Sequence, residues 1–339
     1  MDWRVSAYSW NDPTTKREIR AASSRKLVLR LNAPSTFACS MMGDHDQAKL
    51  ITELITDVTV RADGVDLLRA RCGNTQDTVA ESGYGVSFNF VDYRGVLQRR
   101  ALKSADTLAY APGTEQSDIV WGMVQNIQSR TNGNYGITRG TGATTGITRQ
   151  WNPKPGEFVG KIIDSIGNLA SGFDWDVSPA MALDLYYPQR GLNNGIGLEY
   201  GKSVSSFTRV KTPSTFANDD IVTGGAGTTI VETGSATVAT DPQGRWDGTY
   251  SYPDITDQTT LTARGSWLVA RTALLVPGYT VKLAPGFWKG TAHIGLGDTV
   301  RLLVKRGRIN DNLLLRVLEI PIDIGDDGSE TVQLGLAGA

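Results

Sequence analysis

The chain has 339 residues, of which 40% are hydrophobic and 20% are charged, and 38 of them are glycine. This length predicts two to four domains, and the composition is that of a globular, β-leaning protein, which excludes a disordered or collagen-like chain. The 34 basic and 35 acidic side chains leave a formal net charge of −1. The chain therefore lacks the positive excess of proteins that hold DNA tightly.

The cysteine content and the hydropathy of the chain indicate in which cellular compartment the protein is made. Cys39 and Cys72 are too few for a disulfide framework, and we interpret them as buried free thiols rather than a bridge. No apolar stretch approaches the roughly 20 residues that a membrane-spanning helix needs. Residues 1–4 lack the basic and then apolar layout of a signal peptide. We therefore expect a soluble protein that is made in a cytoplasm.

Residues 1–110 are expected to form an N-terminal β-barrel domain. Asp63-Gly64 separates two β-rich runs and suits a tight hairpin, because glycine accepts a positive φ angle. Val86 and Phe88 alternate with polar residues, which predicts a half-buried strand with a period of two. The predicted elements are strands at residues 3–5, 26–31, 36–41, 57–62, 65–70 and 86–90, and one short helix at residues 47–54.

Residues 111–200 are expected to form a peripheral α+β domain. Ser117-Asp118 can cap a helix that carries an apolar stripe from Ile119 to Ile127. The elements predicted after it are a polar Gly- and Thr-rich loop at residues 131–148, an amphipathic helix at residues 158–169 that ends at Gly172, and a hairpin of residues 174–177 and 182–187.

The remaining chain is predicted as two domains. Residues 201–258, with short β-rich runs at 205–211 and 221–223, form a β and loop connecting domain. Residues 259–339 form a helix followed by a second β-barrel, and either barrel can combine strands that are distant in sequence. The helix is predicted at residues 259–275, where Leu261, Leu268 and Leu275 recur every seven residues and Pro277-Gly278 follows.

The C-terminal segment carries the clearest strand signals in the chain. Residues 296–304, 313–324 and 330–336 are β-rich runs separated by turns that contain Gly, Asp and Asn. This layout predicts an antiparallel meander. The strands carry no combination of nucleophile, base and metal ligand, so the segment is typical of a structural part.

Both histidines are expected to be structural. His45 lies in a polar segment, residues 43–47, and no second His or Cys follows at ligand spacing, so we interpret it as part of a turn at a helix start. His293 lies beside glycine in a strand or turn. Neither histidine is accompanied by the Gly-x-Ser-x-Gly elbow of a serine hydrolase.

Other candidate sites have similar structural interpretations. The glycine-rich residues 140–146 and 224–227 lack the Lys-Ser/Thr of a phosphate-binding loop. The carboxylate pairs Asp174/Asp176 and Asp326/Asp327 resemble a glycosidase pair, but solvated strands and turns often carry such pairs. Residues 323–330 lack the ligand period of a calcium loop. We therefore predict no catalytic residue, no cofactor-binding residue, no metal ligand and no cofactor.

Two surface features are expected to serve contacts. The eight tryptophans are dispersed along the chain, which favours burial in cores and interfaces over a sugar-binding groove. The basic residues Arg301, Lys305, Arg306 and Arg308 are flanked by Asp298 and Asp311. We interpret them as a hairpin rim that pairs with an adjoining subunit or stays hydrated, rather than as a DNA contact.

Three segments resemble a known family. Residues 26–37 resemble the N-terminal strand pair of phage tail hub proteins, and residues 86–92 followed by 97–100 resemble that family's segment of alternating apolar and aromatic residues, Asp, and Leu-x-x-Arg. Residues 297–300, 316–320 and 330–332 resemble its closing barrel strands. The family is the minor tail, or hub, protein of long-tailed phages that infect actinobacteria, similar in fold to the central baseplate hub of contractile-tail phages.

The resemblance implies a fold and a role. The fold would be mainly β with an α+β insert: two tube-type antiparallel β-barrels and a peripheral α+β domain. The protein would be a non-enzymatic virion subunit at the tail tip, assembled in the host cytoplasm. It would form a homotrimeric ring that joins the sixfold tail tube to the threefold tip and lets DNA pass during ejection without specific binding.

The resemblance also implies partners, and the residues leave alternatives open. The implied partners are a distal tail or tail tube protein, the tape-measure protein, and other tail-tip and receptor-binding proteins. The alternatives are a tail-associated cell-wall or polysaccharide hydrolase with catalysis in residues 110–260, or a carbohydrate-binding tail module.

Overall fold

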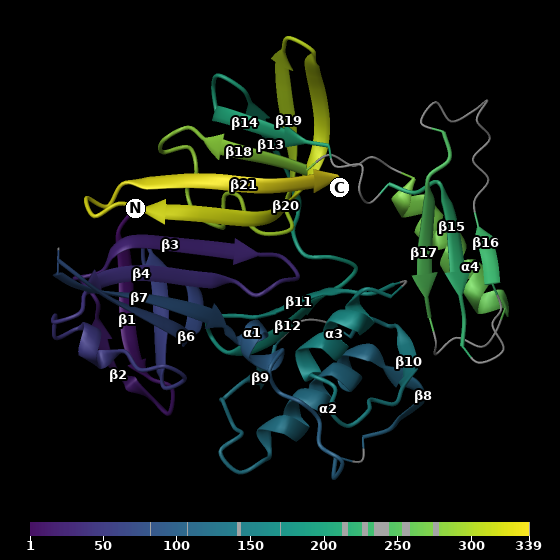
Figure 1. The fold of residues 1–339 in the computed structure, drawn as a ribbon, viewed down its shortest axis with the longest axis horizontal. Helices are drawn as coiled ribbons and strands as arrows, with labels where there is room; N and C mark the ends of the chain where they lie inside the picture. Colours follow the sequence, from purple (N-terminus) through teal and green to yellow (C-terminus); the bar gives the residue numbers. More distant parts are fainter. Residues whose placement is uncertain are drawn as a thin grey trace. The chain divides into compact units, whose positions relative to one another are not determined.

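The chain divides into two compact units. The computed structural model describes residues 1–81, 83–106, 108–140, 144–169, 171–211, 216–225, 230–233, 244–252, 258–273 and 278–338. One unit comprises residues 1–207 and 280–337, and the other comprises residues 208–279 (Figure 1). The predicted mainly β architecture with an α+β insert is confirmed, whereas the predicted domain boundaries at residues 110, 200 and 258 stay a prediction.

The first unit begins with an antiparallel lobe of seven strands. Their order is β3-β4-β7-β6-β5-β1-β2. Alternate side chains of these strands point inward, and Leu27, Phe37, Val60 and Phe90 are fully buried there. The strands are β1 (Trp3–Ser9), β2 (Asp12–Glu18), β3 (Ser23–Arg30), β4 (Thr36–Met42), β5 (Thr56–Ala62), β6 (Val65–Ala80) and β7 (Gly83–Asp92).

Local backbone geometry explains one success and one error in this lobe. Asp63 and Gly64 both have positive φ angles, 47° and 82°, as a tight hairpin between β5 and β6 requires. The predicted helix at residues 47–54 is wrong, since only the 3₁₀ turn η1 (Ala48–Leu50) forms. Leu54 has a φ angle of 62°, and the Thr56 hydroxyl accepts a hydrogen bond from the Thr52 amide, so helical hydrogen bonding cannot continue.

A second β lobe closes the same unit. Its strand order is β14-β18-β21-β20, and β19 pairs with β20 on one side and with β13 on the other. The predicted C-terminal meander corresponds to β19, β20 and β21. The strands are β13 (Asn193–Glu199), β14 (Val204–Val210), β18 (Gly278–Leu283), β19 (Thr299–Arg306), β20 (Ile309–Ile324) and β21 (Glu330–Gly338).

Strand β20 joins the two lobes into one sheet of 13 strands. Its first half pairs with β19, and its second half, residues 319–324, pairs with residues 25–30 of β3. Ile322 lies opposite Leu27, and both side chains are fully buried. The Arg30 guanidinium and the Glu319 carboxylate form an ion pair across the same register at 3.1 Å.

The α+β insert lies between the lobes in sequence (Figure 1). Its core combines Ile119, Met123 and Ile127 of one helix with Ile163 and Ile166 of another, all nearly inaccessible to solvent. Its elements are α1 (Tyr93–Leu97), β8 (Tyr110–Glu115), α2 (Gln116–Gln128), β9 (Thr138–Arg139), β10 (Thr148–Trp151), α3 (Val159–Gly167), β11 (Asp174–Val177) and β12 (Ala182–Tyr186).

The insert confirms both predicted helices and the predicted hairpin, with one correction. The cap of α2 is Glu115 rather than Ser117-Asp118, because the Glu115 carboxylate accepts a 2.6 Å hydrogen bond from the Ser117 amide. In the predicted loop at residues 131–148, residues 141–143 lie outside the described residues.

The second unit, taken by itself, is a small sheet with one helix. Strand β15 (Asp219–Thr223) pairs antiparallel with β16 (Ile230–Thr233) and parallel with β17 (Asp247–Ser251). Helix α4 (Gln258–Thr272) confirms the predicted third helix and buries Leu261 and Leu268 against Val222. Leu275 and Pro277 lie outside the described residues. Within the described part of the chain, every helix is too short or too polar to cross a membrane.

Candidate functional site

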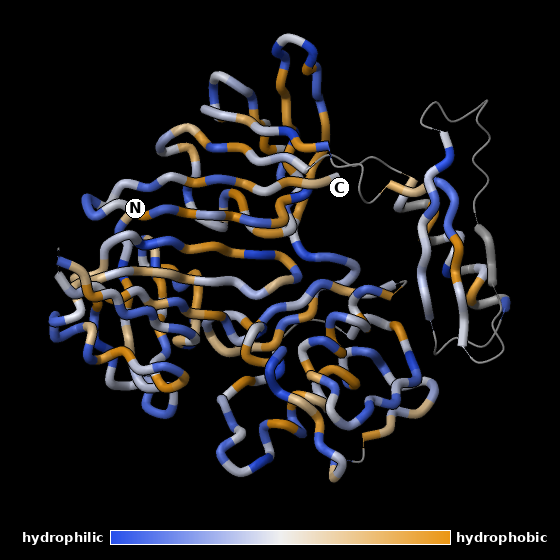
Figure 2. Tube along the Cα trace, in the orientation of Figure 1, coloured by the Kyte–Doolittle hydropathy of each residue, from blue (hydrophilic) through white to orange (hydrophobic). Residues whose placement is uncertain are grey.

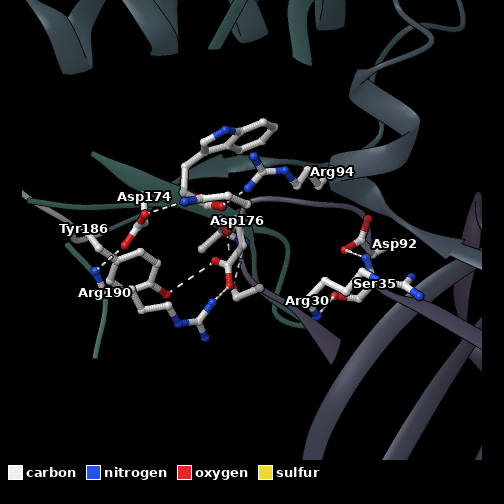
Figure 3. A network of polar contacts seen from close by, with 12 residues as sticks. Arg30, Ser35, Asp92, Arg94, Asp174, Asp176, Tyr186 and Arg190 are labelled. Carbon is white, nitrogen blue, oxygen red and sulfur yellow. Dashed lines mark hydrogen bonds and ion pairs between the residues drawn. The ribbon is translucent and has the colours of Figure 1, made fainter. Parts of the chain in front are cut away.

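Asp174 of β11, which Figure 3 shows beside Asp176, Tyr186 and Arg190, binds groups from three separate segments of the first unit. Its carboxylate accepts hydrogen bonds from the side-chain amide of Asn32, in the turn after β3, and from the Arg190 backbone N–H at 2.7 Å. It also forms an ion pair with the Arg316 guanidinium of β20. The Asp174 and Arg316 side chains are only 8% and 15% exposed. One carboxylate thus ties the insert to both β lobes.

A second acid of the same strand is paired in a similar way. The Asp176 carboxylate forms an ion pair with the Arg190 guanidinium and accepts a 3.3 Å hydrogen bond from the Tyr186 hydroxyl. The Arg190 guanidinium lies over the Tyr186 ring, 4.8 Å from its centre. Burial, followed by the nearby Asp176 charge, raises the pKa of the Tyr186 hydroxyl. The predicted pair Asp174/Asp176 therefore acts as two anchors for arginines.

Arg94 fixes α1 to the rest of the insert. Its guanidinium stacks on the Trp175 ring at 4.1 Å and donates hydrogen bonds to the Trp175 carbonyl and the Asp164 carboxylate. The Trp175 indole N–H donates to the same Asp164 carboxylate at 2.9 Å. Burial lowers the pKa of Arg94, while the Asp164 carboxylate opposes that effect. The buried cation is tolerated because its two terminal nitrogens donate to oxygen acceptors and its plane stacks on Trp175, although Arg94 Nε has no hydrogen-bond partner among the described residues.

Asp92 connects β7 and α1 to the turn after β3. One carboxylate oxygen accepts a hydrogen bond from the Gly95 amide at 2.9 Å and caps α1, and the other accepts from the Ser35 amide at 2.7 Å. Burial raises the Asp92 pKa to about 6, although the two amide hydrogen bonds and the Arg94 charge act in the opposite direction. This junction therefore contains an acid that titrates well above the usual range of Asp.

A second buried ion cluster lies beside Tyr93, the first residue of α1. The Asp57 carboxylate of β5 accepts hydrogen bonds from Arg71 at 2.8 Å and from Arg69 at 3.1 Å. The Tyr93 hydroxyl of α1 donates to Asp57 at 2.6 Å and accepts from Arg71 at 2.5 Å. Asp57 is fully buried, so the cluster orients α1 against β5 and β6 through matched charges.

Aromatic rings surround the Arg71 side of that cluster. The Arg71 guanidinium lies 5.0 Å from the centre of the Trp10 ring and 4.9 Å from that of Tyr135. The Trp10 and Tyr135 rings themselves meet edge to face at 5.3 Å. Tyr135 belongs to the insert and Trp10 follows β1, so cation–π and aromatic contacts add a third connection between insert and lobe.

A cavity of about 470 Å³ opens between β6, the β11–β12 hairpin and residues 291–298. Its charged lining residues are Asp66, Arg69, Asp92, Asp176, Arg190 and Asp298. The four carboxylates have partners: Asp66 pairs with Arg61, Asp176 with Arg190, and Asp92 and Asp298 accept backbone N–H groups. This lining holds the surrounding segments in place.

The histidines lie apart from these clusters. His45 is exposed in a turn, and its Nδ1 accepts a 3.1 Å hydrogen bond from the Gln47 amide. The His293 ring packs against Phe287 with ring centres 5.5 Å apart. Among the described residues, no group of three or more His, Cys, Asp or Glu side chains is positioned to hold a metal ion.

The other candidate residues have local roles. Asp327 accepts a 2.9 Å hydrogen bond from the Ser329 amide in a turn. Cys39 and Cys72 are free and buried, as predicted, and burial raises the pKa of each thiol to about 12. In the glycine-rich segments, residues 141–143 and 226–227 lie outside the described residues.

Sequence reasoning missed Asp57, Arg71, Arg94 and Arg316, which organise the site. A signal existed for Arg69, which lies between Leu68 and Ala70 on the strand predicted at residues 65–70, and the alternation continues through Arg71 and Cys72 just beyond it. Such alternation is also typical of a solvated strand face, so the pattern does not reveal that the insert covers it.

The fold is similar to that of solved phage tail proteins. No protein-family model matches the chain, and no curated protein matches its sequence. The 43 kDa tail protein of prophage MuSo2 from Shewanella oneidensis has a TM-score of 0.66 at 11% identity, with 99% of this chain and 98% of that one aligned. The tail protein from Neisseria meningitidis MC58 has a TM-score of 0.63 at 10% identity, with 99% and 97% aligned.

A secretion-system protein shares the fold more distantly. The E. coli c3393 protein is described as a component of the type VI secretion system with structural similarity to the T4 bacteriophage tail proteins gp27 and gp5. It aligns with a TM-score of 0.50 at 8% identity, over 93% of this chain and 73% of that one. The resemblance to phage tail proteins is confirmed at the level of the fold. Its assignment to phages of actinobacteria stays a prediction.

We expect Asp174→Asn to lower the free energy of unfolding by about 3 kcal/mol, because the Arg316 guanidinium would remain buried without its counter-charge. The asparagine retains an oxygen for Arg190, and the Asn32 amide can reverse, so the variant mainly removes charge. The measurement is urea unfolding, with Asp323→Asn on the same sheet as control. Asp323 and Lys26 are about half exposed and 3.9 Å apart, so this control should change the value by less than about 1 kcal/mol. Equal effects of the two variants would contradict the role of Asp174.

The raised pKa of Asp92 predicts a pH-dependent stability. Its folded pKa of about 6 exceeds the unfolded value of about 3.9, so the folded state binds the extra proton and its advantage disappears as pH rises. Relative to Asp92→Asn, the wild-type protein should lose about 2–3 kcal/mol of unfolding free energy between about pH 4 and pH 6. The hydrogen bond lost in the variant adds a constant that does not change with pH. Parallel stability curves from urea unfolding across this range would disprove the prediction.

Proposed function

We propose that this chain is a structural, non-enzymatic subunit of a phage tail, and that it is the tail-tip hub. The observation that carries the proposal is the likeness of fold to two solved tail proteins over 99% of this chain. The likeness to a protein described as similar to gp27 and gp5 supports the hub assignment in particular. The site supports it too, since its ion pairs join segments of the subunit rather than surround a reacting group.

The proposed mechanism is mechanical. Three copies form a ring, and two β lobes per copy give six lobes that match the sixfold tail tube, while the threefold axis matches the tip. Strand β20 makes the two lobes of one copy a single sheet, so each copy is a stiff segment of the ring. The ring contacts a distal tail or tail tube protein, the tape-measure protein, and the tip and receptor-binding proteins.

The edge strand of the N-terminal lobe is open to a neighbouring molecule, but its side chains restrict which strand can pair with it. Strand β2 is the last strand of the sheet order, and residues 12–17 are exposed along it. Asp12, Pro13, Lys16 and Arg17 on this edge oppose indiscriminate pairing with other strands. Such an edge suits a neighbour of defined shape and charge.

DNA would pass through the ring without specific binding. The formal net charge of −1 gives the chain no general excess of cations for phosphate groups. The ring would be assembled in the host cytoplasm and would act at the tip of the virion tail.

The geometry of the candidate carboxylates disfavours the alternative of a hydrolase, and it offers no support for a carbohydrate-binding module. Asp174 and Asp176, the best carboxylate pair, are each held by an arginine, whereas a glycosidase needs one protonated acid beside the scissile bond. We therefore expect no clearing of cell-wall or polysaccharide substrate in a zymogram. Clearing by the wild-type chain that disappears in Asp174→Asn or His45→Ala, with folding retained, would favour the hydrolase instead.

The proposed hub is tested by the mass and shape of the purified chain. We expect light scattering after size exclusion to give the mass of three chains, and negative-stain images to show a closed ring with a central hole. A folded monomer or a symmetric dimer at all accessible concentrations would argue against a threefold hub.

A further inference from the structure

The β19–β20 hairpin carries apolar and basic side chains that are exposed among the described residues. Leu303 and Leu314 are 39% and 54% exposed, and they flank Arg301, which lies opposite Leu314 in the sheet. Figure 2 shows apolar residues along both strands of this hairpin, below a hydrophilic turn. The turn and its approach contribute three exposed cations, Lys305, Arg306 and Arg308, beside one acid, Asp311.

The β6–β7 hairpin of the N-terminal lobe presents the opposite charge. Its end is exposed on both faces, and Val79 there is 83% exposed. Asp77 lies on this hairpin and accepts a 2.5 Å hydrogen bond from Tyr84, and Glu81 lies in its turn.

The loop after β4 extends this acidic end. The Gly43 amide donates to the Tyr84 carbonyl at 2.9 Å, so the loop and the hairpin are in contact. The pKa of Tyr84 is raised first by its hydrogen bond to Asp77, and Asp44 adds to the negative potential. Met42, at the start of the loop, is 71% exposed. This end therefore combines Asp44, Asp77 and Glu81 with exposed Met42 and Val79.

We propose that the β19–β20 hairpin of one copy docks on the β6–β7 hairpin and the adjoining Asp44 loop of the next copy. The proposal rests on the proposed ring and names the surfaces that close it. Three cations would face three carboxylates at the rim, while the exposed leucines would meet Met42 and Val79. Both halves belong to the same chain, which favours a second copy over a different tail protein as the occupant.

The placement of the two hairpins decides the symmetry of the contact. They belong to different lobes and leave the unit at separate places in Figure 1. A contact between two different surfaces is head-to-tail, and such contacts close into a ring when the rotation between copies permits. A twofold-symmetric pair of copies would instead need both hairpins of each copy in one interface, which their separate places in the unit disfavour.

The test is a charge exchange in the full chain. One variant carries Lys305→Glu, Arg306→Glu and Arg308→Glu; a second carries Asp44→Lys, Asp77→Lys and Glu81→Lys; a third combines all six changes. Each single set should raise the protein concentration at half-assembly by about tenfold or more, because like charges then face each other. The combined chain should assemble close to the wild-type concentration, because the charges are again opposite.

Controls distinguish the effect of charge at the proposed contact from a change in net charge and from a loss of folding. Lys103→Glu, Lys161→Glu and Lys282→Glu change the net charge as much as the first set does, on other parts of the unit, and should leave assembly unchanged. Circular dichroism and thermal unfolding verify that each variant is folded. Added salt should weaken wild-type assembly, since exposed charges are screened.

Each outcome bears on one proposal or on both. A wild-type ring of three that is insensitive to both single sets, or folded single-set variants whose loss of assembly is not recovered in the combined chain, would overturn the docking surfaces and leave the hub standing. A ring of another copy number that follows the charge exchange would support the docking surfaces and overturn the threefold hub. A wild-type chain that stays monomeric would overturn both.

Discussion

The pairing of β20 with strands of both lobes is the constraint on which the first unit depends. Backbone N–H and C=O groups that are buried in a sheet must form hydrogen bonds. Strand β20 has 16 residues, so it is long enough to pair with a strand of each lobe. Residues 309–316 pair with the backbone of β19, and residues 319–324 pair with the backbone of β3. The two lobes cannot rotate independently without exposing these groups and the isoleucines packed between them.

The polar junction follows from that constraint. Once β20 is fixed, Arg316 projects toward the insert, and Asp174 is the carboxylate that meets it. Buried ion pairs of this kind add little net stability, because removing both charges from water offsets their attraction. Their effect is orientation: a misplaced insert would leave Arg316 buried without the Asp174 carboxylate and would take the Tyr93 hydroxyl away from Asp57. The polar contacts thus specify one arrangement that the apolar cores alone do not.

The interior and the surface of the first unit differ in character. The interior of the first unit is held by one continuous sheet and by buried charge clusters, while the exposed edge strand β2 and the exposed hairpin ends carry mixed charge. A part that transmits force in an assembly benefits from this division, since stiffness arises from backbone pairing and selectivity arises from charge at the rim.

The sequence by itself determined the elements whose signals are local. Runs of β-forming residues identified most strands, and Asp63-Gly64 identified a hairpin. Apolar stripes identified α2 and α3, and leucines at a spacing of seven identified α4. Three short segments were also enough to indicate the fold of a phage tail protein. These signals succeed because a strand face or a helix stripe depends on neighbours within a few residues.

Tertiary structure decided how those elements meet. The hairpin turn alone would place Asp57 opposite Ala70, but a bulge between Val60 and Arg61 shifts the register and brings Asp57 opposite Arg71. The pairing of Arg30 with Glu319 and of Asp174 with Arg316 joins residues 289 and 142 positions apart. No local pattern encodes such distances, because they result from which sheets pack together and which buried charges then require a partner.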